Sequence, residues 1–451
     1  MSTAVTLIVP GFAQEARATL RLALPLVAGQ VAQMGAGVIE SMLAGHLGAQ
    51  VLGAVAVGNS VWALAFMALV GVMMALSPSV AQLDGARRRR EVAPVFVQAV
   101  WLGLGLGVVL GAATYLFGPS LAVLTGVDSA LLPDIRRFLH AVAFGAPGLG
   151  LFLACRGLSD GLSLTRASMV FSSIGLLVLA PLGWALMYGR LGLPALGAQG
   201  AGIAWAVLGW VEGLAFAAWI AVSSRYAGLG WQAARGRPDP AGIAALLRLG
   251  APMAVSVLLE VGLFSAAALV IGGFGPTMVA GHQIALNVAG LCFMVPLGLS
   301  MAMTVRVGNA VGRGDPVGVR LAAMAGLALV LVTQALSCTM LAVLSQVIAG
   351  LYTADADVIA ASAGLLLLAA VFQFSDGIQV AAAGALRGLK DTRVPMLITA
   401  FSYWGVGMPL GLVLAFPGGL AAPGVWMGLI AGLTCAAVLL GRRLHLRTRL
   451  G

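Results

Sequence analysis

Two carboxylates stand in the middle of long apolar stretches of this chain. Glu260 lies in the segment PMAVSVLLEVGLFSAAALVIGG, and Asp376 lies in LLLLAAVFQFSDGIQVAAAGAL. A charged side chain at the centre of a bilayer costs about 2.5–3.5 kcal/mol or more, so such residues face a partner or a watery cavity. A carboxylate placed there can exchange a proton, a sodium ion and a cationic organic molecule. These two residues therefore predict a polar pathway for cations through a membrane.

Two further acids, Glu40 and Glu212, also fall inside apolar segments. We take Glu40 as a third candidate for cation or proton coupling. Glu212 is set among Trp205, Trp210 and Trp219, and this setting favours a structural role. For each acid the alternative interpretation is a side chain satisfied by a neighbouring hydroxyl or amide.

Side-chain amides surround the second candidate acid and mark another helix face. Gln373 and Gln379 lie three residues on either side of Asp376, on neighbouring turns of one helix. Gln283 and Asn287 are four residues apart and share one face of another predicted helix. These amides are candidate substrate-binding or supporting groups.

Aromatic residues flank both carboxylates at a spacing of one helical turn. Phe264 follows Glu260 by four residues, and Phe372 precedes Asp376 by four. An aromatic face attracts an organic cation, so the rings are candidates for binding a flat cationic substrate. Packing between helices is an equally good explanation of the same pattern.

Composition places the chain in a membrane. Of 451 residues, 61% are hydrophobic and only 9% are charged, and the mean hydropathy is +1.03. A soluble protein cannot bury that much apolar surface. Stretches of about 20 apolar residues predict membrane-spanning helices, and there are twelve of them: 20–45, 51–80, 95–117, 134–156, 167–189, 200–223, 244–272, 278–305, 321–349, 359–386, 394–416 and 424–441.

The net charge of +10 does not indicate nucleic-acid binding, because the basic residues lie in short segments between the apolar stretches. With alternating loops assigned to opposite sides, only Arg136, Arg137 and Arg190 fall on one side, and every other Lys and Arg falls on the other. Cytoplasmic loops carry the excess of Lys and Arg. The pattern predicts a multi-pass protein of a bacterial-type inner membrane with both termini in the cytoplasm.

The two halves of the sequence resemble one another at an offset of 227 residues. Pro25 matches Pro252, and Gln33 matches Glu260, so Gln33 is a further candidate substrate-binding or supporting group. Six predicted helices separate the two copies, so both copies have the same orientation in the membrane, as in a parallel repeat. We predict an all-α membrane protein with two six-helix lobes, 1–222 and 241–451, joined by a cytoplasmic linker over 223–240.

No motif in the chain indicates an enzyme or a resident cofactor. The four cysteines and four histidines form no pair with metal-ligand spacing. There is no G-x-x-x-x-G-K-[ST] loop, no G-x-S-x-G and no H-E-x-x-H. We predict neither enzymatic activity nor a cofactor.

Several long motifs resemble the NorM-type branch of the multidrug and toxic compound extrusion (MATE) transporters. They are LALPLVAGQVAQMGAGVIESMLAGHLG in the first half, and MVPLGLSMAMTVRVGNAVG and QFSDGIQVAAAGALRGLKDTR in the second. The resemblance implies two six-helix lobes that export amphipathic, often cationic, drugs in exchange for sodium or protons. It also implies that Glu260 and Asp376 hold the coupling ion, with Glu40 matching a further acid.

The chain departs from the family pattern at three places. The family usually has Asp at the position of Glu40, and often Tyr at the position of Phe372, so an oxygen that could bind sodium is missing. Leu179 and Gly183 replace a pair of Asn residues that the family often carries. The polar network predicted for the first lobe is therefore thinner than in the family.

These observations predict a cation-coupled multidrug antiporter, active as a monomer, that uses Na⁺ or H⁺ and alternates the access of its central site. The alternative within transport is a flippase for lipid-linked precursors, which would need basic residues in its pathway for an anionic head group. We expect every Lys and Arg to lie in a loop or at a helix end, which disfavours the flippase. A membrane-embedded enzyme or receptor is a third interpretation, without a supporting motif.

Overall fold

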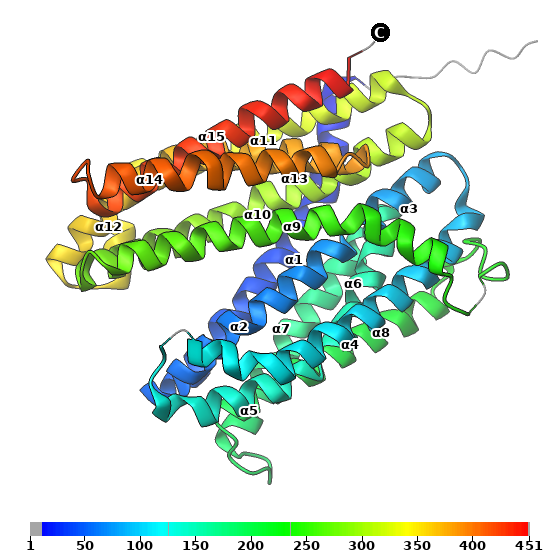
Figure 1. Ribbon diagram of the computed structural model, residues 1–451. Coiled ribbons are helices and arrows are strands. Elements are labelled where there is room, and N and C mark those ends of the chain that lie inside the picture. Colours follow the sequence, from blue (N-terminus) through cyan, green and yellow to red (C-terminus); the bar gives the residue numbers. More distant parts are fainter. Residues whose placement is uncertain (1–10, 125, 235, 450–451) are drawn as a thin grey trace, which may run out of the picture. The chain divides into compact units, whose positions relative to one another are not determined.

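The computed structural model describes residues 11–449, apart from 125 and 235, and every regular element in this part is helical. The longer helices are the ones expected from the apolar stretches, and Figure 1 labels them. Their bounds are α1 Phe12–His46, α2 Ala49–Met73, α3 Leu76–Gly85, α4 Val92–Leu124, α5 Leu132–Ala143, α6 Ala146–Gly161, α7 Thr165–Tyr188, α8 Ala198–Val222, α9 Pro240–Gly272, α10 Pro276–Gly312, α11 Pro316–Tyr352, α12 Ala356–Gly388, α13 Arg393–Ala400, α14 Met408–Ala415 and α15 Ala421–Arg447.

Four short elements complete the described chain. Three are single 3₁₀ turns at connections between longer helices, η1 Arg89–Glu91, η2 Ser129–Leu131 and η3 Ser224–Tyr226. The fourth, η4 Phe401–Gly407, is a π-helix inserted between α13 and α14. A π-helix closes its hydrogen bonds one residue later than an α-helix, and such insertions are frequent at functional sites.

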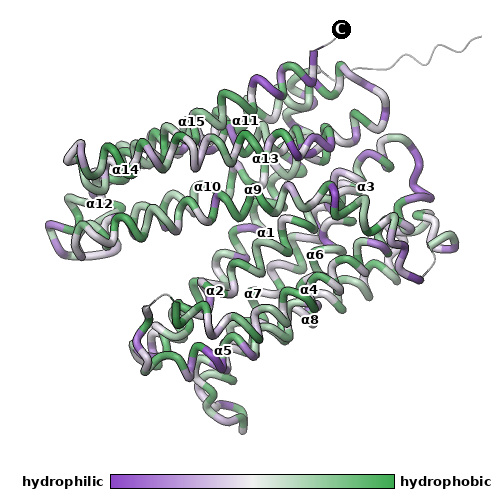
Figure 2. Tube along the Cα trace, in the orientation of Figure 1, coloured by the Kyte–Doolittle hydropathy of each residue, from purple (hydrophilic) through white to green (hydrophobic). Residues whose placement is uncertain are grey.

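Eleven helical segments within the described residues are long and apolar enough to cross a membrane, and a bent pair brings the number to twelve. Hydrophobic residues dominate along their lengths, while hydrophilic residues concentrate at the connections (Figure 2). These findings confirm the prediction of an all-α membrane protein. The fourth predicted span, 134–156, is not one straight helix, because Ser129–Ala143 and Ala146–Gly161 meet at 46°. Pro147, in the first turn of α6, has no N–H with which to continue the preceding helix.

The chain divides into two compact units. Unit 1 holds the described residues up to Val27, together with Gly85–Arg87 and the chain from Leu259 onward; unit 2 holds Ala28–Asp84 and Arg88–Leu258. The long helices α1 and α9 therefore contribute to both units. The sequence-predicted lobe boundaries at 222 and 241 stay a prediction.

In unit 2, helices α4, α6 and α8 pack side by side through glycines (Figure 1). A methyl group at Gly103 of α4 would lie 2.6 Å from the carbonyl oxygen of Gly150 of α6, and a methyl group at Gly150 would collide with Gly103. Small residues allow helix backbones to approach closely in membranes, where packing rather than the hydrophobic effect drives association. The glycine-rich segment of α4 is thus a helix-packing face.

A methyl group at Gly103 should therefore destabilise unit 2. We expect Gly103→Ala to lower the free energy of unfolding by about 1–3 kcal/mol, the usual cost of overpacking, as measured by thermal unfolding in detergent. Gly105→Ala is the matched control on the same helix, because no atom lies within 4 Å of the added methyl group. Equal unfolding temperatures for the two variants would contradict the packing argument.

In unit 1, helix α12 lies at the centre and packs against α10, α11 and α15. Hydroxyl groups support this packing, since Ser300 Oγ donates to the carbonyl oxygen of Val380 at 2.7 Å and Thr304 Oγ1 to that of Gly384 at 2.8 Å. The helix that carries Asp376 is thus enclosed by neighbours on several sides. Its polar side chains must find partners within the unit.

Candidate functional site

The structure brings the two sequence-predicted carboxylates together in unit 1. Asp376 lies on the central helix α12 and is 3% exposed, whereas Glu260 on α9 is half-buried. The two carboxylates interact electrostatically. Two carboxylates that interact inside one unit attract a cation, because a single positive charge relieves the repulsion between their negative charges.

Arg387 belongs to the same charge cluster. It lies on α12, about three helical turns beyond Asp376, and its Nη2 donates to Ser300 Oγ at 2.6 Å. Its charge acts on Glu260. Arg387 lies at the end of its helix, as the charge pattern predicts, and is half-buried.

The amides next to Asp376 have different tasks. Gln379 Nε2 donates to Asp376 Oδ1 at 3.4 Å, a long hydrogen bond that orients the carboxylate. Gln373 is fully buried. Its Nε2 donates to the carbonyl oxygen of Ala289 on α10 at 3.2 Å, and its Oε1 accepts from Gln334 on α11 at 3.1 Å. Gln373 therefore ties α10 and α11 to α12 and acts as a structural support.

The predicted aromatic residues form an edge-to-face cluster. The ring of Phe372 lies 6.0 Å from that of Phe264 and 5.7 Å from that of Trp426. Trp426 Nε1 in turn donates to His282 Nδ1 at 3.2 Å. Because Phe372 is only 3% exposed, packing against its neighbours accounts for its position. Phe264 is half-buried and keeps part of its surface accessible.

Gln283 and Asn287 lie on an exposed part of α10 within unit 1. Gln283 Nε2 donates to Asn287 Oδ1 at 3.2 Å, as their spacing of four residues predicts. The pair leaves donors and acceptors available to a ligand at the surface of the unit.

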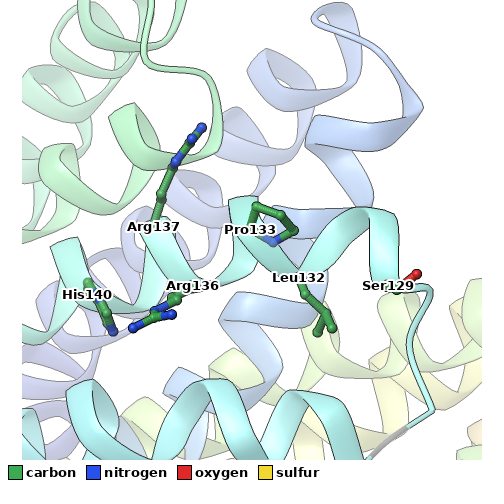
Figure 3. A pocket seen from close by; sticks show the side chains of 6 residues that line it. All are labelled: Ser129, Leu132, Pro133, Arg136, Arg137 and His140. Carbon is green, nitrogen blue, oxygen red and sulfur yellow. The ribbon is translucent and has the colours of Figure 1, made fainter.

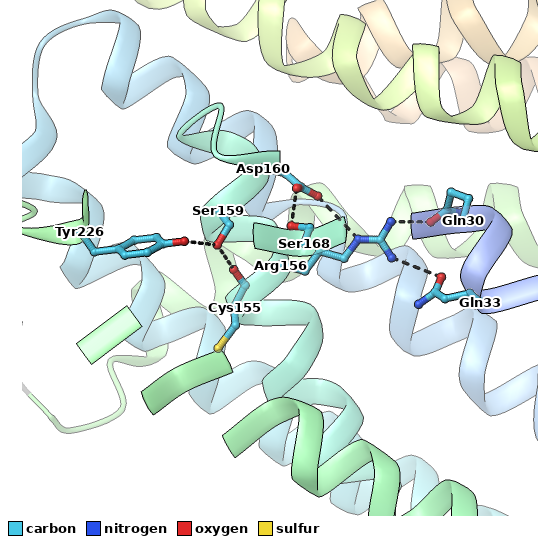
Figure 4. Close-up of polar contacts among 8 residues, drawn as sticks. All are labelled: Gln30, Gln33, Cys155, Arg156, Ser159, Asp160, Ser168 and Tyr226. Atoms are coloured by element: carbon cyan, nitrogen blue, oxygen red, sulfur yellow. Dashed lines mark hydrogen bonds and ion pairs between the residues drawn. The ribbon is translucent and has the colours of Figure 1, made fainter. Parts of the chain in front are cut away.

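Unit 2 contains a polar network that the sequence analysis did not foresee (Figure 4). Arg156 of α6 is 7% exposed; its guanidinium donates to Gln33 Oε1 at 3.3 Å and to Gln30 Oε1, both on α1. Its Nε lies 3.6 Å from Asp160 Oδ2. Ser168 on α7 completes the network, donating to Asp160 Oδ1 at 2.6 Å.

This network bears on two expectations. Arg156 lies inside α6, not in a loop or at a helix end as the charge pattern predicts. The residues next to it in the sequence do not indicate its glutamine partners, which come from another helix. Gln33 was a candidate substrate or supporting group, and its contact with Arg156 favours support. With a gap of four residues added to the offset of 227, Arg156 and Asp160 correspond in the repeat to Arg387 and Asp391. Asp391 binds Arg443 and Arg447, each at 2.9 Å. The two halves therefore use equivalent residues differently.

The other two acids are in unit 2 as well. Glu40 is 5% exposed, and its Oε2 accepts a hydrogen bond from Asn59 Nδ2 at 2.7 Å. Glu212 of α8 packs against Gly175 of α7, where a methyl group would collide with Glu212 Oε1. The charge of Arg156 acts on Glu212. Glu212 therefore faces the interior of its own unit.

A surface pocket of about 450 Å³ lies at the start of α5 (Figure 3). Figure 3 shows Arg136, Arg137 and His140 projecting from this short helix, and His140 stacks on Tyr115 at 3.9 Å between ring centroids. The remaining lining residues are Ser129, Leu132 and Pro133. The pocket is distinct from the carboxylate cluster of unit 1.

Comparisons with known proteins agree with this architecture. The chain is 49% identical over 441 residues to a protein of Xanthomonas campestris pv. campestris described as "Probable multidrug resistance protein NorM", covering 98% of this chain and 96% of the relative. It is 39% identical over 434 residues to the multidrug resistance protein PmpM of Pseudomonas aeruginosa, covering 95% and 91%.

Solved structures show the same fold at low sequence identity. A multidrug resistance MATE family transporter of the MOP superfamily, in an outward-facing conformation, matches with a TM-score of 0.87 at 20% identity, covering 99% of this chain and 98% of the other. The eukaryotic MATE transporter AtDTX14 matches with a TM-score of 0.86 at 21% identity, covering 98% and 100%.

The sequence profile of the MatE family matches the chain twice, over residues 25–185 and 252–413. The two matches begin at Pro25 and Pro252, the pair from which the repeat was inferred. The double match and the full-length relatives lead to one conclusion: the chain belongs to the MATE family.

Proposed function

We propose that this protein exports amphipathic organic cations in exchange for sodium ions or protons, and that Glu260 and Asp376 bind the coupling ion. The relatives described as multidrug resistance proteins support drugs as the substrates. The observation that carries the proposal is the electrostatic interaction between the buried Asp376 and Glu260 within one unit. Membership of a transporter family also confirms the prediction that the chain is not an enzyme.

The charges of this cluster favour the uptake of one cation at a time. Glu260 and Asp376 contribute two negative charges, and Arg387 contributes one positive charge, so the ionised cluster carries a net charge of −1. Uncompensated charge is costly in a membrane interior. One sodium ion or one proton makes the cluster neutral, which supports a stoichiometry of one coupling ion per cycle.

Ion and drug need not share the same atoms. Each needs only to bind one conformation better than the other, because a ligand shifts a conformational equilibrium by its difference in affinity. Gln283 and Asn287, with the accessible part of Phe264, are the proposed contacts for the drug. Glu40 with Asn59 is the proposed second position for a proton or cation.

The contacts of Arg156 argue against the flippase alternative. A buried arginine inside a helix, such as Arg156 of α6, is the kind of group that could bind an anionic head group. Asp160 supplies an opposite charge to Arg156 at 3.6 Å, and the two glutamines occupy further donors. A head group would have to compete with these internal partners.

We further propose that the protein works as a monomer in the inner membrane of a bacterium, without a resident cofactor. Both termini are proposed to be cytoplasmic; the terminal residues themselves lie outside the described part of the chain. Lipid bilayer and small organic cations are its proposed partners, and nucleic acid is not among them.

Ethidium efflux from proteoliposomes tests the proposed function and identifies the coupling ion. The purified protein would be driven in turn by an imposed sodium gradient and by an imposed pH gradient. Efflux under the sodium gradient at equal pH indicates sodium coupling, and efflux under the pH gradient alone indicates proton coupling. Absence of efflux with both gradients and several cationic dyes would count against drug export, and a labelled-lipid translocation assay would then test the flippase.

A further inference from the structure

Tyr403 lies in the π-helix η4 of unit 1, and its side chain is fully buried. Within the described residues, its hydroxyl group has no hydrogen-bond partner. Leaving a buried hydroxyl without a partner costs stability, and each such group in a folded protein calls for an explanation. A π-helix, a buried polar atom and a membrane interior occur together at this residue.

The π-helix is fixed beside one of the two carboxylates. Trp404, the next residue after Tyr403, donates from Nε1 to the carbonyl oxygen of Leu259 at 3.2 Å, and Leu259 directly precedes Glu260. The Tyr403 phenol interacts electrostatically with both Glu260 and Asp376. Three side chains with oxygen atoms, from α9, α12 and η4, thus act on one another electrostatically within unit 1.

The repeat shows that this tyrosine is specific to the second half. Aligning Pro181 with Pro409 places Gly175 of α7 at the position of Tyr403. The space beside Gly175 is filled by the Glu212 carboxylate. Both halves therefore bring an oxygen to this interior position, but the second half does so with a neutral phenol next to two acids.

We propose that the hydroxyl oxygen of Tyr403 is a third ligand, with Glu260 and Asp376, of the coupling ion, and that this ion is Na⁺. The inference rests on the proposed function of the two carboxylates. Hard cations prefer several oxygen ligands, whereas a proton requires one carboxylate alone. A phenol held beside two acids without a partner of its own suits a metal cation. It also supplies the oxygen that Phe372 lacks.

Sodium binding to the purified full-length protein in nanodiscs tests this assignment. Binding of ²²Na⁺ would be measured at pH 8 for wild type and Tyr403→Phe. Loss of one oxygen ligand should weaken the affinity about tenfold, in line with a hydrogen bond to a charged group. In sodium-free buffer Tyr403→Phe should unfold at or above the wild-type temperature, because the substitution removes a buried hydroxyl that has no partner among the described residues.

Tyr226→Phe is the matched control. Tyr226 in unit 2 is 1% exposed, and its hydroxyl lies 2.9 Å from Ser159 Oγ (Figure 4). Removing this hydroxyl should lower the unfolding temperature and leave the sodium affinity unchanged, the opposite of the pattern expected for Tyr403→Phe. Equal weakening of sodium binding in both variants would overturn the assignment.

The measurements separate this inference from the proposed function. If Asp376→Asn loses sodium binding and Tyr403→Phe keeps the wild-type affinity, the assignment of Tyr403 is wrong and the proposed site stands. If wild type binds no sodium yet exports ethidium under a pH gradient, the assignment is likewise overturned and coupling is to protons. If Asp376→Asn and Glu260→Gln both export ethidium as wild type does, the proposed site itself fails.

Discussion

Asp376→Asn is expected to abolish ion-driven efflux of ethidium from proteoliposomes. The substitution keeps the size of the side chain and its hydrogen bond with Gln379, but it removes one of the two negative charges. Glu260 and Arg387 then balance each other, so the cluster no longer attracts a cation. Charge-assisted contacts contribute about 1.5–3 kcal/mol each, so we expect cation affinity to fall by about 10- to 100-fold.

Asp357→Asn is the control for this prediction. Asp357 lies in the first turn of the same helix, α12, and its side chain is exposed. Its replacement changes the net charge of the protein by the same amount without touching the cluster, and efflux should continue at the wild-type rate. Glu260→Gln should behave like Asp376→Asn. Wild-type efflux in the Asp376→Asn variant would contradict the proposed role of the pair.

Arg156→Gln is expected to produce the largest loss of stability among simple polar substitutions in unit 2. The side chains of Arg156 and Asp160 are only 9% and 4% exposed, so the variant leaves a buried carboxylate without its counter-charge. Removing one partner of a buried ion pair costs about 3–5 kcal/mol. The free energy of unfolding in detergent, measured by denaturant titration, should fall by that amount.

Two further variants distinguish the charge effect from simple loss of packing. Arg156→Gln combined with Asp160→Asn removes both charges and should recover much of the lost stability. Arg137→Gln breaks an ion pair with Asp134 of the same 3.6 Å length, but Arg137 is 64% exposed, and exposed pairs contribute about 0–1 kcal/mol. If the double variant were as unstable as Arg156→Gln, the buried charge would not be the cause.

The sequence was sufficient to predict the spans and the repeat; it also singled out the two acids of unit 1, whose role stays a prediction. Apolar length determines where a membrane helix can lie, and an acid within such a stretch stands out against its neighbours. The same reasoning identified Gln379 beside Asp376, because residues three apart on a helix are neighbours whatever surrounds them. Local spacing therefore predicted two of the contacts that are made within one helix, Gln379 with Asp376 and Gln283 with Asn287.

Contacts between helices could not be predicted in this way. Arg156 reaches Gln30 and Gln33 across more than a hundred residues of sequence, and only folding brings α6 against α1. The hydropathy of a segment contains no information about contacts with other helices. The charge pattern therefore assigned Arg156 to a loop or a helix end. The repeat was the one feature of the sequence that could have predicted this contact. Gln33 is equivalent to Glu260, and Arg156 to Arg387, so an interaction between Arg387 and Glu260 implies one between Arg156 and Gln33.

Tyr403 was missed for a different reason. A tyrosine within an apolar span has no signature that separates a packing ring from a ligand, and its significance comes from the π-helix that holds it and from its unpaired hydroxyl. The absence of a tyrosine at the position of Phe372 had suggested a loss of oxygen from the site. In the proposed assignment the phenol of Tyr403 supplies an oxygen from another helix, so the type of residue at a single family position would be a poor guide to the full set of ligands.

The bend between α5 and α6 has a consequence for the evolution of the chain by gene duplication. Counted as a single crossing, the bent pair would give each sequence-predicted half six crossings of the bilayer, and each half would begin and end on the same side. Tandem duplication of one gene for a six-helix protein can then give the present chain directly, with no inversion of the second copy. It follows that the halves, translated as separate polypeptides cut within 223–240, should each insert in the orientation that they have in the intact protein.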